Sequence, residues 1–174
     1  VRDDLFAGTP PLFALRLLTS LTVSKIDHKI MILDVKCAFL YGDIRREVFI
    51  ELPPGDPRST TGDCIGRLKK AMYGTRDAAQ NWEEAYSEFM VSIGFRRGLA
   101  SPCVFYHSRR KLRAVIHGDD FTLLGQGNDL DWFREQISGN FEVEFRGRLG
   151  PSPEDDKAIR ILNRVVRWTA EGIR

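Results

Sequence analysis

Hydrophobic and polar positions follow three different patterns along this chain. A continuous apolar run at 30–33 ends abruptly at Asp34, which is typical of a buried strand. Over 78–92 the large apolar side chains recur at every third or fourth residue, and this spacing predicts an amphipathic helix that is ended by Gly94. At 141–145 apolar and polar residues alternate strictly, which predicts a further strand.

The same patterns predict the other elements. The expected elements are a short buried helix at 12–21, a strand at 47–52, a loop at 56–63, strands at 103–106, 112–116 and 121–124, and a helix through Leu130, Phe133 and Ile137 that is capped by Asn128 or Asp129. The strands at 112–116 and 121–124 are joined by a Gly-Asp-Asp turn into a β-hairpin. The apolar piece at 159–168 fits either a helix or a strand. This order of elements predicts an α+β fold with an antiparallel sheet and packed helices.

The overall composition is that of an ordinary globular domain. With 174 residues, of which 43% are hydrophobic and 29% charged, the chain can bury a substantial core as one domain. The net charge of +2 says little about a nucleic-acid partner. Basic residues nevertheless form two clusters, each of which is either a solvated face or a contact surface: Arg67, Lys69, Lys70 and Arg76, and Arg109, Arg110, Lys111 and Arg113.

The three cysteines are Cys37, Cys64 and Cys103, and they lie far apart in the sequence. No CxxC pair is present, so neither a structural zinc site nor a disulfide framework is expected, and a reducing, intracellular setting suits them. The sequence has no apolar run of membrane-spanning length and no signal-peptide pattern. The chain begins at Val1 rather than at Met, which suggests a fragment of a longer reading frame.

Three carboxylates stand at positions where strands end. Asp34 closes the buried strand, and Asp119 and Asp120 sit in the turn of the expected hairpin. If these strands are neighbours in the sheet, the carboxylates converge, and hard oxygen ligands of this kind suit Mg²⁺. Two such ions about 4 Å apart can stabilise both the attacking and the leaving oxygens in phosphoryl transfer. Taken singly, an Asp after a strand is usually a cap, and a Gly-Asp-Asp turn is usually only a turn.

Five sequence blocks in a fixed order change this balance. They are DVKCAFLYGD at 34–43, EVFIELPPG at 47–55, RLKKAMYGTRDAAQNW at 67–82, GFRRGLASPCVFY at 94–106 and AVIHGDDFTLLG at 114–125. Together they resemble the successive motifs of reverse transcriptases of copia-type LTR retrotransposons, and the resemblance extends roughly from residue 12 to residue 149.

The resemblance implies the palm of a right-hand polymerase that carries the Gly-Asp-Asp hairpin, and an RNA-directed DNA polymerase activity. It makes Asp34 and Asp119 ligands that two Mg²⁺ or Mn²⁺ ions share, adds Val35 to the metal-binding set, and gives Asp120 a supporting role. By the same resemblance, residues 1–150 are the palm with most of the fingers missing. Residues 151–174 then begin a palm-to-thumb or connecting segment.

The resemblance also implies contacts to substrate. Phe39 matches the aromatic residue that lies against the sugar of the incoming nucleotide, and the other implied nucleotide-binding residues are Tyr73, Gly74 and Arg76. Core packing is the plainer interpretation of Phe39 and Tyr73, and a surface charge is that of Arg76. His117 and Gly118 stand where the family has an aromatic residue and a variable one, and both are expected at the primer end. Asp77 departs from the family pattern and is expected to place an acid near the substrate phosphates.

The implied partners are an RNA or DNA template with its primer, deoxynucleotides, and the remainder of a Pol polyprotein with its integrase and RNase H; no membrane is expected. The implied location is intracellular, in a cytoplasmic particle and the nucleus. Three alternatives stay open: an inactive retroelement relic, a module that binds nucleic acid without turnover, and a viral RNA-dependent RNA polymerase. The last is suggested by the Gly-Asp-Asp turn and disfavoured by Phe39, which leaves little room for a 2′-hydroxyl.

Overall fold

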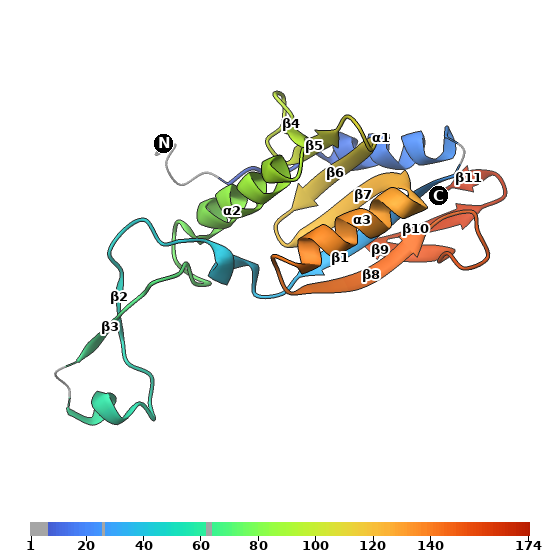
Figure 1. Ribbon diagram of the computed structural model, residues 1–174. Helices are drawn as coiled ribbons and strands as arrows, with labels where there is room; N and C mark the ends of the chain where they lie inside the picture. Colours follow the sequence, from blue (N-terminus) through green and yellow to red (C-terminus); the bar gives the residue numbers. More distant parts are fainter. Residues whose placement is uncertain (1–6, 26, 62–63) are drawn as a thin grey trace.

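A six-stranded sheet forms the centre of the protein in the computed structural model, which describes residues 7–25, 27–61 and 64–174 (Figure 1). Its strands are β1 (His28–Val35), β4 (Arg96–Arg97), β5 (Val104–His107), β6 (Leu112–His117), β7 (Asp120–Gln126) and β8 (Val143–Leu149). They lie in the order β4-β5-β6-β7-β1-β8, and every neighbouring pair is antiparallel. The predicted mixed fold with an antiparallel sheet is therefore confirmed.

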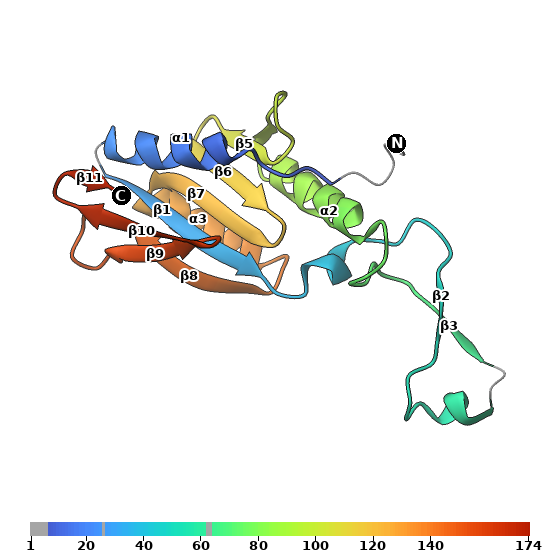
Figure 2. The same cartoon turned by 180° about the vertical axis from the view of Figure 1, so that it is seen from behind.

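Helices cover both faces of this sheet (Figures 1 and 2). Helices α2 (Ala78–Ser92) and α3 (Gly127–Ser138) pack on one face, and α1 (Leu12–Val23) packs on the other. The observed α2 has the predicted bounds. Its apolar stripe includes Trp82 and Met90, which are 1% and 0% exposed and lie in the core.

Strand β1 shows why its sequence is continuously apolar. Met31 and Leu33 belong to the core cluster under α2 and α3. Ile30 and Ile32 point to the opposite face and belong to the cluster under α1. Because successive side chains of a strand alternate between faces, a strand with both faces covered needs apolar residues at every position. The strand predicted at 30–33 is therefore confirmed, and it extends a few residues further at each end.

A second, three-stranded sheet forms the end of the chain and covers part of the α1 face (Figure 2). Its strands are β9 (Ala158–Ile161), β10 (Arg164–Thr169) and β11 (Gly172–Ile173). Ile159 and Ile161 are buried in the same cluster as α1. The segment at 159–168, which the sequence left open between helix and strand, is thus a β-hairpin.

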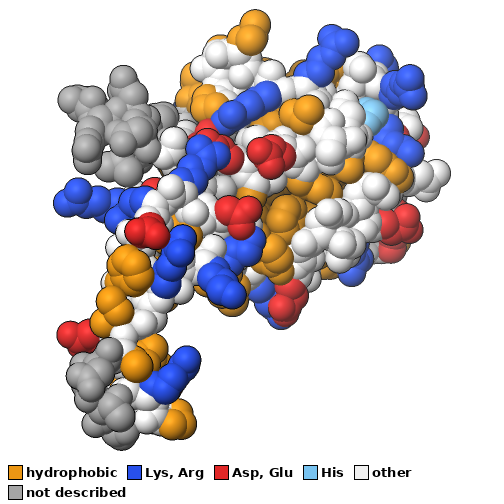
Figure 3. All heavy atoms as spheres, turned by 60° about the vertical axis from the view of Figure 1, so that its left-hand side comes forward, with side chains coloured by type: hydrophobic (Ala, Val, Ile, Leu, Met, Phe, Trp, Pro, Cys, Tyr) orange, Lys and Arg blue, Asp and Glu red, His pale blue; other side chains and the backbone are white. Residues whose placement is uncertain are grey.

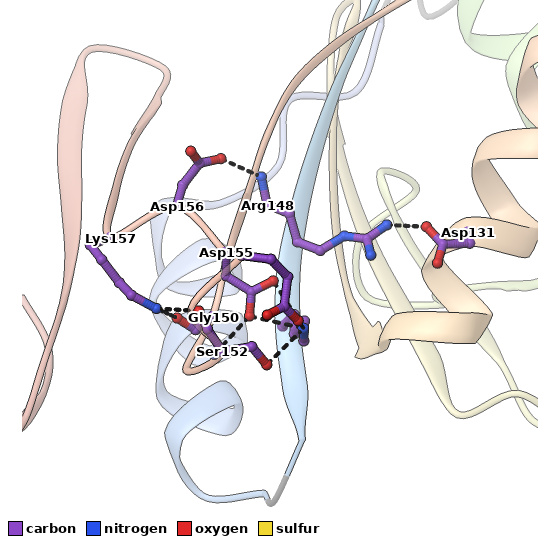
Figure 4. Close-up of polar contacts among 9 residues, drawn as sticks. Asp131, Arg148, Gly150, Ser152, Asp155, Asp156 and Lys157 are labelled. Carbon is purple, nitrogen blue, oxygen red and sulfur yellow. Dashed lines mark hydrogen bonds and ion pairs between the residues drawn. The ribbon is translucent and has the colours of Figure 1, made fainter.

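Salt bridges fix the loop between β8 and β9 to the central sheet (Figure 4). Lys29 of β1 lies 2.9 Å from Asp155, whose side chain is only 1% exposed. Burial alone would lower the pKa of Lys29, but hydrogen bonds to Asp155 and Glu154 outweigh it and raise the pKa. Lys157 Nζ donates to the Gly150 carbonyl at 2.9 Å. This network sets where the tail sheet meets the central one.

An arm projects from the body between β1 and α2 (Figure 1). It contains β2 (Phe49–Glu51), η3 (Pro57–Thr61) and β3 (Ile65–Arg67). The 3₁₀ turn η2 (Ala38–Tyr41), which precedes the arm, packs against the core of the body. Strand β2 is shorter than the predicted strand at 47–52, and among the described residues it pairs only with β3. The predicted loop at 56–63 contains the 3₁₀ turn η3, and its last two residues lie outside the described residues. A two-stranded sheet is marginal by itself, which explains why β2 is short.

Two other expectations about helices need correction. Helix α1 is present, but it is not fully buried, because Phe13 and Leu17 are 69% and 56% exposed along one side. Helix α3 is not capped by Asn128 or Asp129. It begins at Gly127 directly after β7, with Gln126 at the N-cap and no side-chain cap, so both residues lie inside its first turn. Within the described residues, no helix combines the length and apolar character that crossing a membrane requires.

Candidate functional site

The three predicted carboxylates meet at one end of the central strands. Asp34 on β1 lies directly opposite Asp120 on β7 in the antiparallel ladder. Asp119 lies in the turn between β6 and β7, and its backbone carbonyl accepts a hydrogen bond from the Val35 N–H at 3.0 Å. Directly opposed residues carry their side chains on the same face, about 5 Å apart at Cβ. The structure therefore brings Asp34, Asp119 and Asp120 together, with Val35 beside them.

A side chain of helix α2 holds the turn that carries Asp119 through a hydrogen bond. Gly118 adopts a left-handed backbone with φ of 62°, a conformation that glycine accepts without strain. The Trp82 indole Nε1–H donates a hydrogen bond to the Gly118 carbonyl at 2.8 Å. From sequence alone Trp82 is only a core residue, although a buried indole N–H usually needs a partner. That need is the one signal that could have indicated this contact.

Charge repulsion is built into this group of acids. Burial raises the pKa of Asp120, and the neighbouring charges of Asp119 and Asp34 raise it further, while His117 and Arg146 act in the opposite direction. Because its neighbours make the ionised form of Asp120 costly, a cation is favoured beside it. The carboxylate oxygens of these acids are the donors that Mg²⁺ and Mn²⁺ prefer. The donor chemistry of these residues therefore suits a divalent ion.

Two charged residues of β8 join the site, and sequence analysis missed both. Arg146 Nη2 lies 3.3 Å from Asp34 Oδ2, and Arg146 Nη1 lies 3.2 Å from Glu144 Oε1. Glu144 is itself directly opposite Asp34 in the ladder, so Asp120, Asp34 and Glu144 form a row across three strands. In the part of the chain that the structure describes, no group of three His, Cys, Asp or Glu side chains is arranged so that it could hold a metal ion by itself. The three acids lie close together but do not form a complete set of metal ligands.

An aromatic pair stands beside the carboxylates. The rings of Phe39 and Tyr73 are 4.6 Å apart between centroids. Burial raises the pKa of Tyr73, and the charges of Asp119, Cys37 and Asp34 raise it further, which places the phenol close to the acids. Tyr73 is 52% exposed, whereas Phe39 packs partly against the core. The pair can therefore pack against the core through Phe39 and remain accessible to a ligand through Tyr73.

The other predicted nucleotide-binding residues lie in the segment before α2. Gly74 has φ of 89°, and a Cβ there would meet no other atom within 4 Å. Arg76 is exposed, and none of the described contacts joins it to the carboxylates. Asp77, which was expected to place an acid near the substrate phosphates, has a cationic partner within the protein. It is 6% exposed, and Arg46 pairs with it at 3.2 Å, which neutralises the acid within the protein.

The tip of the tail hairpin borders the site from the other side. A hollow of about 470 Å³ is lined by Leu162 and Asn163 at that tip, by Leu12 and Leu15 of α1, and by His117 and Asp120. His117 is exposed and lies opposite Asp120 in the ladder. No pattern in the sequence indicated that the tail reaches this place, because its secondary structure was undecided.

The face at which the arm joins the body is rich in charge (Figure 3). Basic side chains lie around several acidic ones on this face. The two predicted basic clusters are partly neutralised. Arg67 lies 3.5 Å from Glu47, Lys70 pairs with Asp43, and Arg110 pairs with Asp129 at 2.8 Å.

Comparison with known proteins identifies the family. The model of a family described as reverse transcriptase (RNA-dependent DNA polymerase) matches residues 2–150. The retrovirus-related Pol polyprotein from transposon TNT 1-94 of Nicotiana tabacum is 27% identical over 87% of this chain and 11% of its own length. That from transposon RE2 of Arabidopsis thaliana is 30% identical over 64% of this chain and 8% of its own. The transposon Ty1-MR1 Gag-Pol polyprotein of Saccharomyces cerevisiae is 33% identical over 87% and 8%.

This chain spans about a tenth of the length of these relatives. The family model covers all the residues that converge at the acidic site, from Asp34 to Arg146. The resemblance seen in the five sequence blocks and these matches agree. The chain therefore belongs to the reverse transcriptase family of RNA-dependent DNA polymerases, in its copia-type LTR-retrotransposon branch.

Proposed function

We propose that this domain catalyses RNA-directed DNA synthesis, in which deoxynucleotides are added to a primer by two-metal nucleotidyl transfer. The observation that carries the proposal is the direct cross-strand pairing of Asp34 with Asp120, next to the turn that carries Asp119. Membership of the family supplies the class of reaction. The arrangement of sheet, helices and Gly-Asp-Asp hairpin supports the palm of a right-hand polymerase.

In this proposal Asp34 and Asp119 hold two Mg²⁺ or Mn²⁺ ions, with Val35 at their side, and Asp120 supports them. When bound, such ions activate the primer 3′-hydroxyl and neutralise charge on the leaving pyrophosphate. The protein itself holds the carboxylates in position. The β1–β7 ladder fixes Asp34 against Asp120, and Trp82 fixes the turn.

Substrate contacts follow from the same placement. Phe39 forms the floor under the sugar of the incoming deoxynucleotide, and Tyr73 and Gly74 contact the nucleotide and the template base. Arg76, which is exposed, provides a positive charge for a phosphate. His117 and Gly118 contact the primer end, since they lie at the hairpin that also carries the acids.

The proposed partners are an RNA or DNA template with a primer, deoxynucleotides, and the other parts of a Pol polyprotein, including an integrase and an RNase H. Residues 1–150 act as the palm, and 151–174 begin the connection to a thumb. An intracellular protein, in a cytoplasmic particle and then the nucleus, fits that context.

A second candidate is a retroelement relic, or a module that binds nucleic acid without turnover. The observation in its favour is that Asp34 already forms a salt bridge with a cation of the chain itself, Arg146. The two functions differ in their response to divalent ions. A polymerase requires them, whereas binding through basic residues alone weakens with salt and needs no metal.

Primer extension tests the proposal. The chain is joined to the flanking segments of a copia-type Pol polyprotein and is given an RNA template, a DNA primer, deoxynucleotides and Mg²⁺. We expect extension by the wild type, and a loss of roughly a thousandfold or more in Asp34→Asn, because a metal anchor is removed. Arg109→Gln, a charge change away from the acids, is the control. Equal extension by Asp34→Asn and the control would refute the assignment.

A further inference from the structure

Arg146 reaches Asp34 because β8 contains a bulge. Along β1, Ile32 pairs with Gly147 and the next residue, Leu33, pairs with Phe145, so Arg146 is an extra residue on β8 with no partner across the ladder. Bulges of this kind redirect side chains and are frequent next to active sites. Gly147 makes the bulge possible, since it has φ of 149° and an added Cβ would lie 2.6 Å from Asp156 Oδ2.

The guanidinium of Arg146 is shared between two acids of different exposure. It lies 3.3 Å from Asp34, whose side chain is 20% exposed, and 3.2 Å from Glu144, whose side chain is 46% exposed. Arg146 itself is 49% exposed, so it can leave Asp34 without losing its hydration. Glu144 provides a second acid to hold the guanidinium when Asp34 is engaged elsewhere.

We propose that Arg146 is a displaceable counter-cation of Asp34, which holds this carboxylate in place until a divalent ion takes it, and that Glu144 then retains the guanidinium. This inference rests on the proposed function, because it takes Asp34 as a metal ligand. A divalent ion must compete with Arg146 for the Asp34 oxygen. The bulge therefore sets the metal affinity of the site as well as the position of a side chain.

The proposal makes opposite predictions for the two partners. Arg146→Gln removes the competitor and should tighten Mn²⁺ binding by about three- to tenfold, the scale of a partly exposed ion pair together with one nearby charge. Glu144→Gln leaves Arg146 with Asp34 alone and should weaken Mn²⁺ binding by about two- to threefold. In the double variant the Glu144 effect should vanish, because Glu144 acts through Arg146. A general field effect would instead persist unchanged in the double variant.

The test is a titration of the full chain and its variants with Mn²⁺ alone. The electron paramagnetic resonance signal of the unbound ion is measured at each step and gives the affinity for Mn²⁺. Arg134→Gln is the matched control. It removes the same charge from a residue that stacks on Phe145, 4.5 Å from the ring, and that has no described contact with Asp34. Melting curves check that each variant folds. If Arg146→Gln does not fold, Arg146→Met replaces it, since it keeps an aliphatic stem.

The outcomes separate the inference from the proposed function. Tighter binding in Arg146→Gln but not in Arg134→Gln, with no Glu144 effect in the double variant, supports the inference. Mn²⁺ binding that is lost in Asp34→Asn but equal in Arg146→Gln and Arg134→Gln overturns the inference and leaves the metal site standing. Absence of Mn²⁺ binding in the wild type, or binding that does not depend on Asp34, overturns both.

Discussion

Replacing Trp82 by Phe should weaken the metal site through the hairpin turn. The substitution keeps an aromatic ring in the core but removes the indole N–H, whose only described hydrogen bond is to the Gly118 carbonyl at 2.8 Å. It also shortens a ring that packs edge-on against Tyr86 at 5.4 Å and Phe141 at 5.2 Å between centroids. We therefore expect a looser turn under Asp119, in addition to an ordinary packing defect.

The size of the effect follows from these two losses. The hydrogen bond contributes about 1 kcal/mol to the free energy of unfolding, and no more, because the Gly118 carbonyl lies at an exposed turn where water can replace the donor. The missing part of the ring costs about 1–2 kcal/mol by comparison with larger core truncations. A total of about 2–3 kcal/mol lowers the melting temperature of a domain this size by roughly 4–12 °C.

Phe89→Leu is the matched control for Trp82→Phe. Phe89 lies in the same cluster and contacts Phe133 and Phe141, but it has no described contact with the turn. Melting curves and Mn²⁺ titrations are measured on both variants. Both should lose stability, and only Trp82→Phe should bind Mn²⁺ more weakly. Equal Mn²⁺ affinity in the two variants would show that Trp82 is a packing residue and that the turn does not depend on its N–H.

Three further predictions concern the acids and the sugar. In primer extension, Asp119→Asn should be as damaging as Asp34→Asn, roughly a thousandfold, whereas Asp120→Asn should cost less because its role is supporting; equal losses would remove that distinction. Phe39→Val should admit ribonucleotides with little loss of deoxynucleotide use. In the wild type the Phe39 ring leaves little room for a 2′-hydroxyl and would displace a ribonucleotide, and even a 1 Å displacement of a reacting group can cost about a hundredfold in rate. An unchanged ratio of ribonucleotide to deoxynucleotide use in single-nucleotide extension would make Phe39 a core residue only. Burial alone would raise the pKa of Asp77, but hydrogen bonds from Arg46, from its own backbone N–H and from Asn81, together with the charge of Arg46, outweigh burial and lower the pKa below 3.8. This acid therefore stabilises the fold above pH 3.8, and the contribution is lost as the pH falls below that value. Asp77→Asn should therefore lower the melting temperature at pH 7 but not at pH 2, and a deficit that is the same at both would contradict this.

The parts of the fold that were predicted correctly are those with a long, regular pattern. Helix α2 has the predicted bounds because its apolar stripe extends over four turns and Gly94, with φ of 98°, ends it. Strand β1 was recognisable because both of its faces are covered. The tail hairpin was not, since the apolar positions at 159, 161, 162, 165, 166 and 168 fit the spacing of a helix as well as that of a strand. Which of the two forms was decided by packing against α1, a contact between distant parts of the chain.

The site could be predicted only as far as its residues lie in ordered motifs. Asp34, Asp119 and Asp120 belong to such motifs, and the pairing of β1 with β7 brings them together. Arg146 could not be found, because the strict alternation at 141–145 gives no sign of the bulge that follows it. The ion pair of Asp77 could not be predicted for a related reason. Its partner Arg46 lies 31 residues earlier in the sequence, and only the fold brings the two together.

The most direct test of the central claim is the effect of Mg²⁺ on the stability of this chain. Scanning calorimetry is carried out on the wild type and on Asp34→Asn, with and without the ion. At a concentration tenfold above its dissociation constant, Mg²⁺ should stabilise the wild type by about 1.4 kcal/mol. That raises its melting temperature by roughly 3–6 °C, and Asp34→Asn should not respond. An unchanged wild type, or an equal rise in Asp34→Asn, would contradict a metal site built on Asp34, Asp119 and Asp120.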